Sequence, residues 1–162
     1  MNMVHFHLLL NHFPIIGTLI GVCLLGWGIF RKQDILRFTG ALIISIMALI
    51  TLPVNKSGEE AEESVEHMQG ISEAMLEEHE ETAETAFFSM CITGLLSIGS
   101  LALDRRSHSK TSLAYVTTFV LSLITCGFMI QAGYYGGQIR RPDLHGGGQQ
   151  NQEQTHEEKE HH

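Results

Sequence analysis

Four apolar segments of about twenty residues each dominate this sequence of 162 residues. They cover approximately residues 8–30, 36–55, 84–104 and 112–134. A helix of about 20 apolar residues spans the hydrocarbon layer of a bilayer, where every backbone group must be hydrogen-bonded within the protein. The sequence therefore predicts an all-α fold, an integral membrane four-helix bundle with up-down topology.

The charged residues are distributed unequally between the connections. The long connection from Lys56 to Glu84 holds eleven glutamates and one lysine, and the chain has a net charge of −8. The two short connections carry basic residues, namely Arg31, Lys32, Arg37, Arg105, Arg106 and Lys110. Because basic residues accumulate in cytoplasmic loops, we predict a multi-pass membrane protein with both termini and the acidic connection outside.

The acidic connection itself carries helix signals. Ser57 followed by Glu60 has the spacing of a capping box, which predicts a separate outer helix over about residues 58–69. Ser72 can cap the next helix, and no glycine or proline follows until well inside the third apolar segment. We therefore predict one continuous helix over residues 73–103 that projects above the membrane.

Residues 1–143 are predicted to form this transmembrane domain, with lipid as its main surroundings. The polar, low-complexity residues 144–162 are predicted to be a disordered tail. No nucleophile–base pair, phosphate-binding loop or H-E-x-x-H motif is present in the sequence, so a conventional enzyme is not indicated. The acidic composition likewise does not indicate nucleic-acid binding, whereas a homo-oligomer is compatible with the pattern.

Histidines are concentrated on the side predicted to face outward. Counting about 1.5 Å per residue from the inner edge of each span places His12 at the outer boundary, with His5 and His79 at similar heights above it. In one continuous helix, His5 and His12 lie within about 20° of one another, whereas His7 points away. His79 lies on a small, apolar face that is expected to turn inward. Ionisable groups at this depth are often functional, so His5, His12 and His79 are predicted to be metal ligands.

Several polar residues are predicted at similar heights and could complete or orient this site. They are Asn55, Glu59, Glu63, Glu84 and Gln131. Pro14 removes the amide that would bond the carbonyl of Leu10, so the helix is expected to loosen or kink beside His12. Imidazole and carboxylate groups suit zinc, copper and iron. The candidate cofactors are therefore a transition-metal ion, or a haem b held at the rim by His79 with His5 or His12.

A second interpretation needs no cofactor. The outer acidic face would then dock a partner protein, and the histidines would be structural or pH-responsive. Ten histidines with pKa values near ~6.5 would become charged as the outside acidified, which would reduce the repulsion among the glutamates. The residues alone leave the metal site and the docking scaffold open.

Four stretches together resemble a family of small predicted bacterial four-helix membrane proteins of uncharacterised function. They are LLLNHFPIIG, SGEEAEESVEH, EEHEETA and GGQIRRPD. The resemblance covers residues 3–143 and implies a four-helix membrane domain. Broadly similar domains occur beside respiratory modules, which implies an electron-transfer or accessory subunit with a respiratory or periplasmic redox partner. Arg141 stands where relatives often have histidine, which removes that residue from any shared site.

Overall fold

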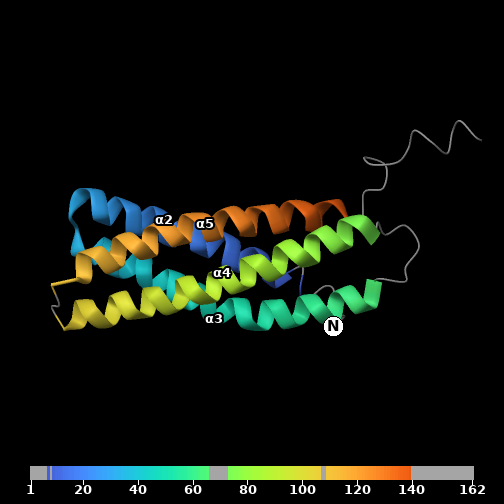
Figure 1. Cartoon of the computed structure of the whole chain (residues 1–162), viewed down its shortest axis with the longest axis horizontal. Coiled ribbons are helices and arrows are strands. Elements are labelled where there is room, and N and C mark those ends of the chain that lie inside the picture. The colour runs from blue at the N-terminus through green and yellow to red at the C-terminus, as the bar shows by residue number, and fades with distance from the viewer. Residues whose placement is uncertain (1–6, 8, 66–72, 107–108, 140–162) are drawn as a thin grey trace, which may run out of the picture.

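The computed structural model of the chain describes residue 7 and residues 9–65, 73–106 and 109–139. These residues form the helices α2 (His12–Arg31), α3 (Asp34–Val65), α4 (Glu73–Arg105) and α5 (Thr111–Gln138). Consecutive helices run antiparallel in one bundle (Figure 1), and each is long and apolar enough to cross a membrane. The predicted all-α four-helix bundle is confirmed, and the chain is a multi-pass membrane protein surrounded by lipid.

Two short connections lie at one end of the bundle, and we call the opposite end the outer end, after the predicted orientation. The first connection is a tight turn in which Lys32 adopts a left-handed conformation with φ 54°. The backbone N–H of Gln33 then donates to the carbonyl of Gly28 at 2.9 Å, which satisfies a free carbonyl at the end of α2. This arrangement brings α3 back along α2.

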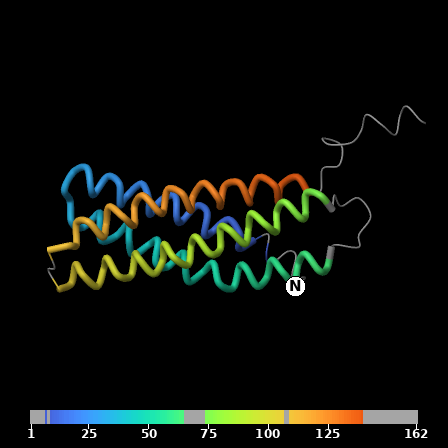
Figure 2. The backbone as a smooth tube through the Cα atoms, in the orientation of Figure 1, coloured from blue at the N-terminus to red at the C-terminus, as the bar shows by residue number. Residues whose placement is uncertain are grey.

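The helices differ in length, and this difference forms the outer end. α3 has 32 residues and α4 has 33, which makes each about 50 Å long, whereas the hydrocarbon layer is about 30 Å thick. Residues 55–65 of α3 and 73–84 of α4, which we call the outer extensions, therefore continue beyond the membrane-spanning parts. Figure 2 shows both helices reaching past the start of α2. The predicted continuous helix over residues 73–103 is confirmed.

The separate outer helix predicted over residues 58–69 is wrong where the structure describes it. Residues 58–65 are the last turns of α3, which continues through Pro53 and Ser57 without interruption. Ser57 caps nothing, because its hydroxyl donates to the carbonyl of Val54 one turn earlier at 2.8 Å. The change from apolar to acidic composition marks where α3 leaves the membrane rather than where it ends. The remainder of that segment and the predicted tail lie outside the described residues.

The interior of the bundle mixes apolar and hydroxyl-bearing side chains, and its surface is apolar. Among the eleven largest fully buried side chains of the described residues, seven are serines or threonines, namely Thr18, Thr93, Ser97, Ser100, Thr118, Ser122 and Thr125. Large apolar residues such as Leu95 and Ile130 point outward instead. Lipid solvates apolar side chains as well as a protein core does, so membrane helices associate through small and hydroxyl-bearing residues. This core fits a protein whose surroundings are lipid.

Candidate functional site

A cavity of about 440 Å³ lies between all four helices at the outer end of the bundle. One part of its wall carries titratable side chains, namely His7, Glu59, Glu62, His79, Glu80 and Glu84. The other part is apolar and includes Pro14, Ile15, Ala86, Phe87, Met129 and Ala132. A largely apolar pocket with a few converging polar groups is the usual form of a ligand-binding site.

His79 connects three helices at the polar wall. Its Nδ1 lies 2.8 Å from the backbone carbonyl oxygen of Ala132 on α5, so Nδ1 must carry the proton that is donated. In the neutral imidazole this leaves Nε2 with its lone pair. Nε2 lies 3.8 Å from Oε1 of Glu62 on α3. Gly136 leaves room for the ring, since a Cβ there would lie 3.0 Å from the Cε1 atom of His79.

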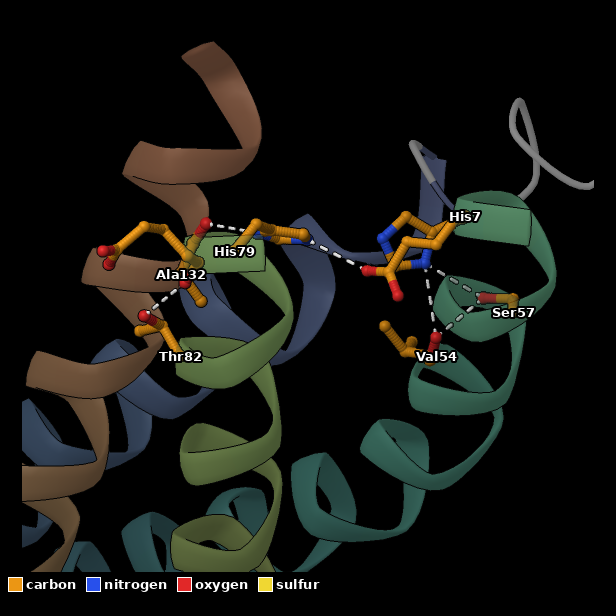
Figure 3. A network of polar contacts seen from close by, with 8 residues as sticks. His7, Val54, Ser57, His79, Thr82 and Ala132 are labelled. Atoms are coloured by element: carbon orange, nitrogen blue, oxygen red, sulfur yellow. Dashed lines mark hydrogen bonds and ion pairs between the residues drawn. The ribbon is translucent and has the colours of Figure 1, made fainter. Parts of the chain in front are cut away.

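His7 lies across the cavity from His79, and Figure 3 shows the two rings pointing toward one another. Nδ1 of His7 lies 3.3 Å from the carbonyl oxygen of Val54 and 3.2 Å from the hydroxyl of Ser57. The carbonyl fixes Nδ1 as the donor, which again leaves Nε2 as the acceptor. Burial lowers the pKa of His7, and the charge of His79 lowers it further, although the bond to Val54 opposes both effects. His7 is therefore neutral near pH 7.

Glu62 is the least exposed carboxylate of the cluster, with 22% of its side chain exposed. It lies in the outer extension of α3, beyond the membrane-spanning part. Burial raises the pKa of Glu62 from its usual 4.5 to about 7, and the carboxylates of Glu80 and Glu59 add to this effect. Glu59 in turn accepts a hydrogen bond of 2.8 Å from the amide of Asn55. The cavity therefore holds a carboxyl group that exchanges a proton near neutral pH.

The three predicted ligands differ in their position relative to the cavity. His79 lines the cavity, as its inward-facing position predicts. His12 is exposed and does not line it, and His5 lies outside the described residues. α2 begins at His12, but the preceding residue Asn11 has helical backbone angles of φ −60° and ψ −25°, and its N–H donates to the carbonyl of His7 at 2.9 Å. His7, Asn11 and Pro14 have helical spacing and all line the cavity. His7, which was expected to point away, therefore faces the cavity, and His12 lies on another face.

The supporting residues also divide into two groups. Asn55, Glu59 and Glu84 line the cavity as predicted, whereas Glu63 and Gln131 are exposed and do not. Three further residues line the cavity that were not predicted from the sequence, namely His7, Glu62 and Glu80. Glu62 could have been predicted from its spacing along α3, because Val54, Gly58 and Glu62 follow one another at intervals of four residues. They share one face of α3, but only if α3 is continuous.

This arrangement offers two imidazole nitrogens and several carboxylates to a positively charged group. Among the described residues, no three histidine, cysteine, aspartate or glutamate side chains are placed to hold a metal ion together. The geometry thus places Nε2 of His79 and Oε1 of Glu62 3.8 Å apart, with His7 on the opposite wall of the cavity. No family model, curated protein or solved structure matches this chain.

Proposed function

We propose that this protein is an accessory membrane subunit whose outer cavity binds a transition-metal ion between His79 and Glu62. The observation that carries the proposal is the distance of 3.8 Å between Nε2 of His79 and Oε1 of Glu62. This distance is too long for a hydrogen bond. A metal such as zinc bonds nitrogen and carboxylate oxygen at about 2.0–2.2 Å each, so an ion fits between these two atoms with little movement of either.

The surroundings of His79 support its role as a ligand. A histidine that binds a metal usually donates its other N–H to a carbonyl or carboxylate, which fixes the orientation of the ring. His79 already makes that bond to Ala132, and His7 makes its equivalent to Val54. We propose that Nε2 of His7 supplies a third ligand when the ion draws the two sides of the cavity together, and that water completes the coordination.

The charge of the cavity favours an ion over haem b. Four glutamates line it, namely Glu59, Glu62, Glu80 and Glu84, and the propionate groups of a haem would be repelled by them. A small cation instead neutralises part of this charge. Imidazole and carboxylate together accept zinc, copper, iron and manganese. The electron-transfer role stays a prediction from the sequence, and it requires a metal that changes oxidation state.

The cavity faces the outside if the basic connections are cytoplasmic, as we propose for a bacterial inner membrane. The asymmetry of the basic residues supports this orientation. A cysteine introduced at Gln33, in the turn between α2 and α3, should then resist an impermeant maleimide added to intact cells. Ready labelling from outside would reverse the orientation and place the cavity in the cytoplasm.

Metal binding is tested by substituting His79 and, separately, His12, both of which are predicted from the sequence to be ligands. The background protein is the full chain with the tail residues His145, His156, His161 and His162 changed to alanine, so that the tail binds no metal. Zn²⁺, Mn²⁺, Cu²⁺ and Fe²⁺ are titrated into it by calorimetry in detergent, and bound metal is measured by elemental analysis. We expect one ion per chain, and His79→Ala should weaken binding at least tenfold.

His12→Ala is the matched control, because His12 lies at the same end of the bundle but outside the cavity. We expect its metal affinity to equal that of the background protein. The proposal fails if none of the four metals binds stoichiometrically, or if His79→Ala keeps full affinity while remaining folded. A visible spectrum of the purified protein with a Soret band would favour haem instead.

A second candidate function is supported by the proton exchange of Glu62 near pH 7. Protonation removes one negative charge from the cluster at the ends of α3 and α4, so a partner docked on this end would respond to pH. In this case the cavity needs no metal. The two functions differ in the titration above, since a scaffold binds none of the four ions stoichiometrically.

A further inference from the structure

The cavity is much larger than a metal ion requires. Its volume of about 440 Å³ compares with roughly 30 Å³ for one water molecule in the liquid. An ion with a few waters would therefore fill only the polar part between His79 and Glu62. The apolar part lies one to two turns deeper in the bundle, where Ala86 of α4 and Met129 of α5 belong to the buried core. Water is poorly accommodated against such a wall.

Many of the polar groups around the cavity offer hydrogen-bond acceptors, chiefly the carboxylates and the Nε2 atoms of the two histidines. The Nδ1–H groups of His7 and His79 are already used, and the hydroxyl of Thr51 donates to the carbonyl of Met47. One of the two N–H groups of the Asn55 amide donates to Glu59. Asn11, which also lines the cavity, has a buried Oδ1 with no hydrogen-bond partner among the described residues. A ligand that satisfies these groups must bring donors, and the glutamates require that it be positively charged.

We propose that the cavity also binds an organic amine, with its ammonium group among Glu62, Glu59 and Glu80 and an apolar body between Phe87 and Met129. An ammonium group carries three donors and no acceptor, which matches a wall of acceptors. The apolar body removes the deeper wall from water, and the aromatic ring of Phe87 can also contact it. This inference goes beyond the proposed metal site and does not depend on it, although an amine and a metal ion would compete for Glu62.

Phenethylamine and 2-phenylethanol are a matched pair of probes, because they share a skeleton and differ in the ammonium group. Each is titrated by calorimetry at pH 8 into the full chain in lipid nanodiscs containing EDTA, and the heat from empty nanodiscs is subtracted. We expect saturable binding of one phenethylamine per chain and at least tenfold weaker binding of 2-phenylethanol. Equal affinity of the two compounds, or no saturable binding of the amine, overturns the proposal.

Two substitutions test the two halves of the cavity separately. Glu62→Gln removes the charge and should weaken phenethylamine binding about tenfold. Met129→Trp fills the deeper half and should abolish it. Ile130→Trp is the control for the larger side chain, because Ile130 is the next residue on α5 and points outward with 58% of its surface exposed.

The metal titration separates this proposal from the preceding one. Met129→Trp should keep the metal affinity of the unsubstituted protein, because Met129 contributes no ligand, and this retained affinity also shows that the variant is folded. If Met129→Trp keeps full affinity for phenethylamine, the amine site is not in this cavity. If phenethylamine does not bind while a metal ion binds, only the amine proposal fails. If phenethylamine binds while no metal ion binds, only the metal proposal fails.

Discussion

The middle of the bundle is closely packed, whereas its outer end contains a cavity. In the middle, helices touch through glycines and hydroxyls, and the buried hydroxyls of Ser97, Ser100 and Thr125 all have partners. At the outer end, the same helices surround a cavity with carboxylates and an unpartnered amide oxygen. Close packing with paired polar groups stabilises a fold, whereas a buried polar group without a partner calls for an explanation, such as a bound water or ion.

In the contact between α2 and α3, the backbones of the two helices approach one another closely. A Cβ at Gly40 would lie 2.5 Å from the backbone nitrogen of Leu25 and 2.7 Å from the carbonyl oxygen of Gly21. These are backbone atoms, which can move only if the two helices separate. We therefore expect a substitution of Gly40 to destabilise the protein more than the other substitutions described below.

Gly40→Ala should destabilise the protein by about 3 kcal/mol or more, because the two helices would have to separate along their contact. Unfolding by added SDS, followed by circular dichroism, measures the loss. Gly99→Ala is the control, because a Cβ there meets no atom within 4 Å, and alanine should favour the helix by up to about 1 kcal/mol. Equal stability of Gly40→Ala and Gly99→Ala would show that close packing does not distinguish the middle of the bundle.

The sequence predicts the middle of the bundle far better than the outer end. Hydropathy locates the four spans, and the inward face of α4 correctly indicates His79. The prediction of His12 rather than His7 treats the face of the helix that carries His5 and His12 as the inward one, whereas the cavity is lined by the face that carries His7, Asn11 and Pro14. Glu62 was missed because a helix starting at Ser57 could face any direction, whereas a continuous α3 inherits its orientation from the membrane span.

The carboxylate cluster should make the outer end sensitive to pH. Because the pKa of Glu62 in the folded protein is about 7, above its usual 4.5, its contribution to stability is greatest below pH 4.5. The contribution diminishes as the pH rises and is lost above pH 7. Glu62→Gln should therefore stabilise the protein at pH 8, by about 2 kcal/mol given the partial exposure of the side chain, and have little effect at pH 4.5.

Thermal unfolding in detergent at pH 4.5 and pH 8 measures this difference between Glu62→Gln and the unsubstituted protein. Glu63→Gln is the matched control, because Glu63 is the next residue, is exposed and does not line the cavity. It should change stability little at either pH. A stabilisation by Glu62→Gln that is the same at both pH values would mean that the charge of Glu62 is not its cause.

The smallest expected effect comes from the hydroxyl contacts between α4 and α5. The Oγ1 of Thr125 lies 2.7 Å from Oγ of Ser89 and 2.8 Å from Oγ1 of Thr93. Thr125→Val keeps the shape and removes both contacts, together with the bond from Thr125 to the carbonyl of Leu121 in its own helix. We expect a loss of only about 0.5–1.5 kcal/mol, because hydroxyls in separated membrane helices find other partners.

Thr117→Val is the control, since Thr117 is exposed and bonds only the carbonyl of Leu113 in its own helix. Unfolding in SDS should show a larger loss of stability for Thr125→Val than for Thr117→Val. If the two variants lose equal stability, the buried hydroxyls contribute no more than exposed ones, and the middle of the bundle is stabilised by close packing alone.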